Sequence, residues 1–139
     1  MFIDTDSGKG RALLLASRFG FKEIIGIELS ARLKAVAKDN LCIFRDELQK
    51  CSKIQSICQD VLDYELPKEN MVFYLYNPFD EQVMRSVVSK LEDFVRRFSK
   101  SVYVLYQHPL HRNVWEQSEC FRTFKIKDRC AIFRSKNRA

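Results

Sequence analysis

Residues 2–10, with the sequence FIDTDSGKG, decide the fold expected for this chain. The apolar residues 1–3 predict a short strand, and the polar turn that follows contains two glycines. The very apolar segment 11–19 predicts a helix, which Gly20 ends. Glycines allow the backbone to turn sharply and to approach a ligand closely, and the N-terminus of a helix offers free N–H groups. This opening therefore favours a site for a polar ligand.

A second strand is expected at residues 23–27, directly before the acid Glu28. Residues 24–27 form a continuous run without polar alternation, which is typical of a parallel strand covered on both faces. An acid at the tip of such a strand can accept hydrogen bonds from a ribose. Strand, glycine turn, helix, strand and acid together outline a nucleotide-binding β-α-β unit.

This opening resembles that of class I S-adenosylmethionine-dependent methyltransferases. The resemblance rests on residues 2–11 and 26–29. The family pattern is an acid, three alternating glycines, and a second acid that ends the second strand. In this chain Asp4 is the first acid, and Gly8 and Gly10 hold two of the three glycine positions.

Asp6 departs from the pattern, because it stands at the first glycine position. One alternative is therefore a catalytically degenerate module that keeps the fold for binding or as a scaffold. A second alternative is an NAD-type oxidoreductase, although Leu13 stands at the third position of the dinucleotide fingerprint that Gly8 and Gly10 would begin. A phosphate-binding P-loop is rejected, because Ile3 stands where its first glycine belongs.

The rest of the chain alternates predicted helices and strands. Apolar residues at helical spacing predict helices at residues 31–49 and, after a cap at Asp80, through residues 83–98. Apolar and aromatic runs predict strands at residues 54–58, 71–76, 101–106, 120–127 and 130–134, with a loop at residues 107–112 and the lone Trp115 after it. The last two strands alternate polar and apolar residues, as in an antiparallel hairpin.

The resemblance implies that residues 1–139 form a single Rossmann-like α/β domain. We expect a mostly parallel seven-stranded sheet with helices on both faces and a C-terminal antiparallel hairpin. The leading helices that relatives usually carry before the first strand are absent. The chain is therefore either a minimal version or a piece truncated at its N-terminus, and a partner domain is a candidate to supply a lid.

The resemblance also implies S-adenosylmethionine as the cofactor. The residues expected to bind it follow the carboxyl ends of the first four strands, where open α/β sheets bind ligands. They are Asp4, Asp6, Ser7, Gly8, Gly10, Glu28, Leu29, Asp60, Val61 and Asn77.

The family assigns a role to each part of this set. Asp4 and the glycines would line the amino-acid end of the cofactor. Glu28 would bind the ribose hydroxyls, Leu29 would lie against the adenine, and Asp60, with Val61 beside it, would bind the adenine amino group. Taken singly, these residues are equally typical of helix caps and solvated loops; the prediction depends on their order along the strand ends.

Residues 77–79, Asn-Pro-Phe, are similar to the Asn/Asp-Pro-Pro-aromatic motif of methyltransferases that act on amino nitrogens. Asn77 is therefore the candidate catalytic residue, which would face the methyl group and position the acceptor. Only one proline is present, and the same residues also suit a turn that ends a strand. Tyr106 and His108 follow the fifth strand, and we interpret His108 as an ordinary loop histidine.

Composition leaves the methyl acceptor open between a small molecule, a protein and a nucleic acid. Lys and Arg number 24 against 18 Asp and Glu, and the net charge of +6 arises mainly near the C-terminus. A basic end can favour an acidic partner, although a solvated surface is the simpler interpretation.

No apolar run approaches the roughly 18 residues of a membrane span, so no membrane partner is expected. The five cysteines lack a C-x-x-C pair, and we expect buried, reduced thiols in a cytoplasmic protein and no metal site. They are Cys42, Cys51, Cys58, Cys120 and Cys130.

Overall fold

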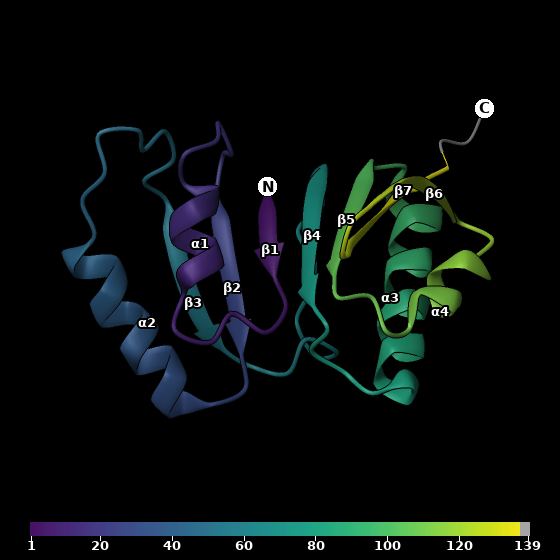
Figure 1. The fold of residues 1–139 in the computed structure, drawn as a ribbon, viewed down its shortest axis with the longest axis horizontal. Helices are drawn as coiled ribbons and strands as arrows, with labels where there is room; N and C mark the ends of the chain where they lie inside the picture. Colours follow the sequence, from purple (N-terminus) through teal and green to yellow (C-terminus); the bar gives the residue numbers. More distant parts are fainter. Residues whose placement is uncertain (137–139) are drawn as a thin grey trace. The chain divides into compact units, whose positions relative to one another are not determined.

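A computed structural model describes residues 1–136 of the chain (Figure 1). The described residues form alternating strands and helices and divide into two compact units, Met1–Tyr64 and the residues from Glu65 onward. In chain order the elements are β1 (Phe2–Asp4), α1 (Arg11–Ala16), β2 (Ile24–Glu28), α2 (Ala31–Ile43), β3 (Ile54–Cys58), β4 (Met71–Tyr76), α3 (Glu81–Phe98), β5 (Val102–Gln107), α4 (Arg112–Glu116), β6 (Phe121–Lys127) and β7 (Cys130–Ser135).

The first unit contains three parallel strands in the order β3-β2-β1. All five residues of β2 are buried, which agrees with its continuous apolar sequence. Right-handed crossovers between parallel neighbours place the connecting helices on one face, and α1 and α2 lie on the same side of these strands. The carboxyl ends of β1, β2 and β3 therefore meet at one edge.

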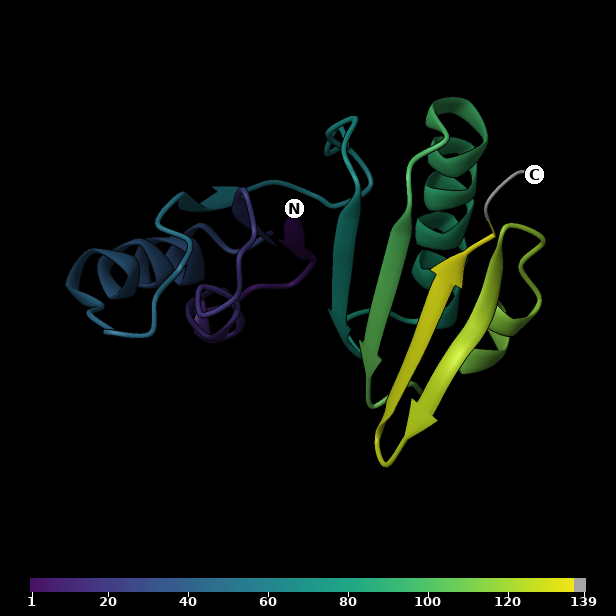
Figure 2. The same cartoon turned by 90° about the horizontal axis from the view of Figure 1, so that it is seen from above.

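The second unit contains four strands in the order β4-β5-β7-β6. Strands β4 and β5 are parallel, whereas β7 runs antiparallel to both β5 and β6. Figure 2 shows α3 and α4 on the same side of these strands. On that side lies a core of large side chains, in which the Trp115 ring stacks on Phe133 and meets Phe121 edge-on. The prediction of an α/β fold with a terminal antiparallel hairpin is confirmed.

Helix α3 follows its predicted apolar stripe along its whole length. Asp80 caps it, since the side chain accepts a hydrogen bond from the Val83 N–H at 2.9 Å. Arg96 and Arg97 lie in the last turn, where positive charge interacts favourably with the helix dipole.

Three local predictions are wrong. Helix α2 ends at Ile43 and not at residue 49, because Phe44 adopts an extended conformation and Asp46 binds Arg18 and the Leu48 N–H instead of continuing the helix. Its apolar spacing beyond this point reflects no burial, since Leu48 is 62% exposed.

The other two corrections concern α4 and the cysteines. Arg112, interpreted as the end of a loop, instead begins a short helix over residues 112–116 that buries Val114 and Trp115. The thiols are free, but only Cys51 is buried, whereas Cys42 and Cys58 are exposed. No helix among residues 1–136 combines the length and apolar character that crossing a membrane requires.

Candidate functional site

The glycine turn after β1 is held against the end of β2. The Ser7 N–H donates to the Ile27 carbonyl at 3.1 Å, and the Gly10 N–H donates to the Ser7 carbonyl at 2.8 Å. Gly8 and Gly10 have φ values of 52° and 88°, in the left-handed region that favours glycine. The turn therefore needs both glycines for its path from β1 into α1.

Glu28 joins this turn to the start of α2. Its Oε2 accepts a hydrogen bond from the Gly8 N–H at 2.8 Å, and its Oε1 accepts one from the Ser30 N–H at 2.9 Å. The residue is only 4% exposed. A carboxylate offers about four acceptor positions, and the two N–H groups fill two of them, which leaves capacity for other donors.

Two more carboxyl groups gather beside Glu28, at Asp4 and Asp6. Burial raises the pKa of Asp4 from 3.8 to about 7, with smaller contributions from Asp6 and Glu28, although the Asp6 N–H opposes this as a donor. Burial also raises the pKa of Asp6 to about 6, helped by the charge of Glu28 and by a hydrogen bond between the two side chains. Asp6 is exposed, and its side chain contacts Glu28, the residue that is predicted to bind the ribose.

The remaining predicted residues of the first unit follow β2 and β3. Leu29 is 68% exposed and offers an apolar surface next to Glu28. Asp60 follows β3, whose Cys58 pairs with Glu28 across the sheet, and its Oδ1 accepts the Leu62 N–H at 2.8 Å. Val61 is buried at 3% exposure, so it supports the turn and does not present a surface.

Three residues that the sequence reasoning did not assign also shape the site. A Cβ atom on Gly26 would lie 2.5 Å from Ser7 Oγ and 2.7 Å from a Leu13 methyl group, so bare backbone is required there. Ser30 binds Glu28, as above, and also caps α2. The Asn40 side chain donates to the Lys9 carbonyl at 2.9 Å and ties α2 to the turn. A glycine inside a strand is a signal of close backbone approach, and it was the available clue for Gly26.

Asn77 lies in the second unit, at the end of β4. Its φ is 42°, and its Oδ1 accepts a hydrogen bond from the buried Tyr106 hydroxyl at 3.3 Å. The His111 N–H donates to that hydroxyl at 3.1 Å. Tyr106 therefore orients Asn77, and His108 contacts the Tyr76 ring edge-on at 5.1 Å. The catalytic role of Asn77 stays a prediction.

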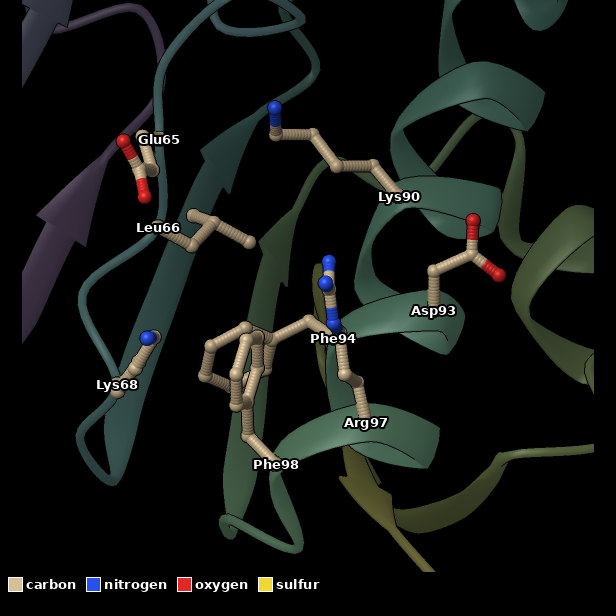
Figure 3. A pocket seen from close by; sticks show the side chains of 8 residues that line it. All are labelled: Glu65, Leu66, Lys68, Lys90, Asp93, Phe94, Arg97 and Phe98. Carbon is tan, nitrogen blue, oxygen red and sulfur yellow. The ribbon is translucent and has the colours of Figure 1, made fainter.

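The second unit also contains a pocket of about 220 Å³ that no predicted site residue lines (Figure 3). Lys68 and Arg97 lie over the Phe98 ring, at 5.2 and 5.5 Å from its centroid. Glu65 and Asp93 bring negative charge to the same pocket. Within residues 1–136, no group of three or more His, Cys, Asp or Glu side chains is placed to hold a metal ion.

The fold is similar to that of three solved methyltransferase structures. A protein from Haemophilus influenzae described as a methylase is 17% identical, with a TM-score of 0.66 over 96% of this chain and 78% of its own. The ribosomal protein L11 methylase of Lactobacillus delbrueckii subsp. bulgaricus is 12% identical, with a TM-score of 0.62 over 99% of this chain and 70% of its own.

The third structure is an RNA methyltransferase from Salinibacter ruber in complex with S-adenosyl-L-homocysteine. It is 18% identical, with a TM-score of 0.58 over 96% of this chain and 78% of its own. No protein-family model and no curated protein matches the sequence. The predicted Rossmann-like methyltransferase fold is thus confirmed from structure at low sequence identity.

Proposed function

We propose that this chain binds S-adenosylmethionine through its first unit and transfers the methyl group to an acceptor. The observation that carries the proposal is the anchored carboxylate of Glu28. Backbone N–H groups of Gly8 and Ser30 fix both of its oxygens beside the exposed Leu29. A fixed acceptor next to an apolar surface suits a ribose that is linked to an adenine.

The acidic surroundings of Glu28 also suit this cofactor. S-adenosylmethionine carries a positively charged sulfonium and an ammonium group, and the carboxyl groups of Asp4 and Asp6 are close to Glu28. Opposite charges attract strongly where water is partly excluded. The bound cofactor supplies an activated methyl group, so the protein mainly has to position the reactants.

The acceptor side of the proposal concerns Asn77. Its hydrogen bond with Tyr106 fixes the amide, and the second lone pair of Oδ1 can accept a hydrogen bond from an amine N–H. The residues Asn77, Pro78 and Phe79 support an amino nitrogen as the acceptor atom. The similar structures include an RNA methyltransferase, and we extend nucleic acid to this chain as a candidate class of substrate.

A degenerate binding module is the second candidate, and the position of Asp6 favours it. The Asp6 side chain occupies hydrogen-bonding capacity of Glu28 that a ribose would use. Such a module would bind the cofactor weakly or not at all while keeping the fold.

Isothermal titration calorimetry with S-adenosylhomocysteine tests the proposal. We expect saturable binding that Glu28→Gln weakens by about tenfold or more, because losing one charged hydrogen bond costs roughly 1.5–3 kcal/mol. Glu47→Gln, an exposed acid of the same unit, is the matched control and should bind as the parent chain does.

Three results would contradict the proposal. Failure of the folded chain to bind S-adenosylhomocysteine would support the degenerate module, and thermal unfolding would show that the sample is folded. Tighter binding of NAD than of S-adenosylhomocysteine in a parallel titration would support the oxidoreductase alternative. If Glu28→Gln and the parent chain bind S-adenosylhomocysteine with equal affinity, Glu28 does not contribute to the binding site.

A further inference from the structure

Among the residues of the second unit up to residue 136, no helix lies on one face of the strands. Helices α3 and α4 lie on the same side of these strands (Figure 2), and the residues that alternate toward that side are buried, including Phe73, Val104 and Phe133. The intervening residues of β5 and β7 are only half-buried. We call this second face, formed by the half-buried side chains and their neighbours on β6, the open face.

Strand register arranges the open face in three rows, each of which ends in a cation on β6. The rows run across β4, β5, β7 and β6 in that order, since paired residues point to the same side of a sheet. They are Val72–Tyr103–Arg134–Arg122, Tyr74–Leu105–Ile132–Lys125 and Tyr76–Gln107–Cys130–Lys127.

Aromatic rings on the open face lie among these cations. Phe124 is 53% exposed and meets the Tyr103 ring edge-on at 5.6 Å. The Arg134 guanidinium lies over the same Tyr103 ring at 5.4 Å. Tyr76, at the end of β4, is 57% exposed and directly precedes Asn77. The surface thus combines π-faces with positive charge.

The two arginines of the open face, Arg122 and Arg134, make no ion pair with a carboxylate of the described part of the chain. None of the strands β4 to β7 contains an acidic residue. Arg122 and Arg134 are directly opposite each other, and like charges in this arrangement repel. Within residues 1–136, Arg134 Nε is buried without a hydrogen-bond partner. An anion between the two guanidinium groups would relieve the repulsion between them.

We propose that the open face binds single-stranded nucleic acid, with Arg122 and Arg134 holding a backbone phosphate and Phe124 and Tyr103 stacking on bases. Basic side chains that follow the backbone and aromatic rings that stack on unpaired bases are the two elements of single-strand recognition. The third row runs from Lys127 on β6 to Tyr76, which directly precedes Asn77, so a strand that continues along this row reaches the neighbourhood of Asn77. This proposal names the acceptor class for the methyl transfer above, and to that extent it rests on the proposed function.

Fluorescence anisotropy with labelled 16-nucleotide oligouridylate and oligothymidylate measures this binding without any cofactor. We expect both probes to bind the intact chain, and the Arg122→Gln/Arg134→Gln double variant to bind at least tenfold more weakly. Because each neutralised phosphate on a single strand contributes about 0.7 to the log–log salt slope, and the two arginines hold one phosphate, the double variant should lower that slope by about 0.7. Phe124→Ala should weaken binding by about tenfold without changing the slope.

Arg85→Gln/Arg97→Gln, which removes two exposed cations from α3, is the matched control and should change affinity less than twofold. Equal losses in the two double variants would overturn the proposal, since they would reflect net charge alone. Absence of binding at 50 mM salt would overturn it too. So would dimerisation in sedimentation analysis that Phe124→Ala abolishes, because a second copy would then occupy the open face.

The outcome is distinguishable from that of the proposed function. If the chain binds S-adenosylhomocysteine but no oligonucleotide, only the proposal for the open face is contradicted. Intact oligonucleotide binding without cofactor binding would leave a nucleic-acid-binding module of methyltransferase fold.

Discussion

Asp6 is the residue whose contact with Glu28 bears most directly on the proposed cofactor site. The family pattern places a glycine there, and the structure shows why a side chain matters at this position. The Asp6 carboxyl hydrogen-bonds to Glu28, and their mutual repulsion contributes to the raised pKa of Asp6. The position was recognisable from the sequence, whereas the contact with an acid 22 residues later required the three-dimensional path of the turn.

We predict that Asp6→Gly strengthens binding of S-adenosylhomocysteine by about tenfold, equivalent to about 1.4 kcal/mol. The substitution frees acceptor capacity on Glu28 and removes a competing side chain from the turn. Calorimetric titration at pH 7 measures the change. Asp6→Asn serves as the comparison, because it removes the charge and keeps the volume. Unchanged or weaker binding by Asp6→Gly would contradict the idea that Asp6 obstructs the cofactor.

At the scale of elements, the site depends on how closely the turn and α1 approach β2. Gly26, in the middle of β2, lies beneath Ser7 and Leu13. The turn reaches Glu28 only because no side chain separates it from the strand. Packing in β2 and the position of the turn beside Glu28 are therefore coupled.

We predict that Gly26→Ala lowers the free energy of unfolding by about 1–3 kcal/mol, the usual cost of overpacking a core position. The new methyl group would meet Ser7 and Leu13 at distances that real side chains do not adopt. Urea unfolding followed by circular dichroism measures the loss. Gly20→Ala is the matched control, since a Cβ atom there meets nothing within 4 Å. Comparable stabilities of the two variants would contradict this account of the turn.

Helices and strands were predicted accurately where their apolar residues match the face that is buried. Helix α3 and strand β4 were predicted nearly to the residue, because their patterns match their buried faces. The end of α2 was predicted wrongly, because the apolar spacing continues past Phe44. In the structure the chain is no longer helical there, and Asp46 contacts Arg18. Helix α4 is too short to show periodicity.

The same reasoning applies to the site. Asp4 and Glu28 were predicted as site residues because each stands at the carboxyl end of a predicted strand, and the carboxyl ends of parallel strands meet at one edge of the sheet. The ties made by Ser30 and Asn40, and the hydrogen bond between Tyr106 and Asn77, depend on tertiary contacts. No local pattern in the sequence encodes such contacts.

At the scale of the whole molecule, the net charge of +6 conceals an opposite local charge. Acids gather at the turn of the first unit, whereas the strands of the second unit carry only cations. The native state keeps protons on Asp4 and Asp6 at pH values where the unfolded chain has lost them. Global stability should therefore report on this buried acidic cluster.

We predict that the free energy of unfolding decreases as the pH rises from about 5 to about 7.5. The pKa values of Asp4 and Asp6 are raised to about 7 and about 6 from 3.8, so the native state binds more protons than the unfolded state across this range. A shift of about three units for Asp4 corresponds to at most about 4 kcal/mol; the contribution of the half-exposed Asp6 is smaller because solvent screens it. Urea unfolding at several pH values should show the decrease in the parent chain, a much smaller one in Asp4→Asn, and an unchanged one in the exposed control Asp63→Asn. If Asp4→Asn kept the full decrease, the pH dependence would have to arise from groups other than Asp4.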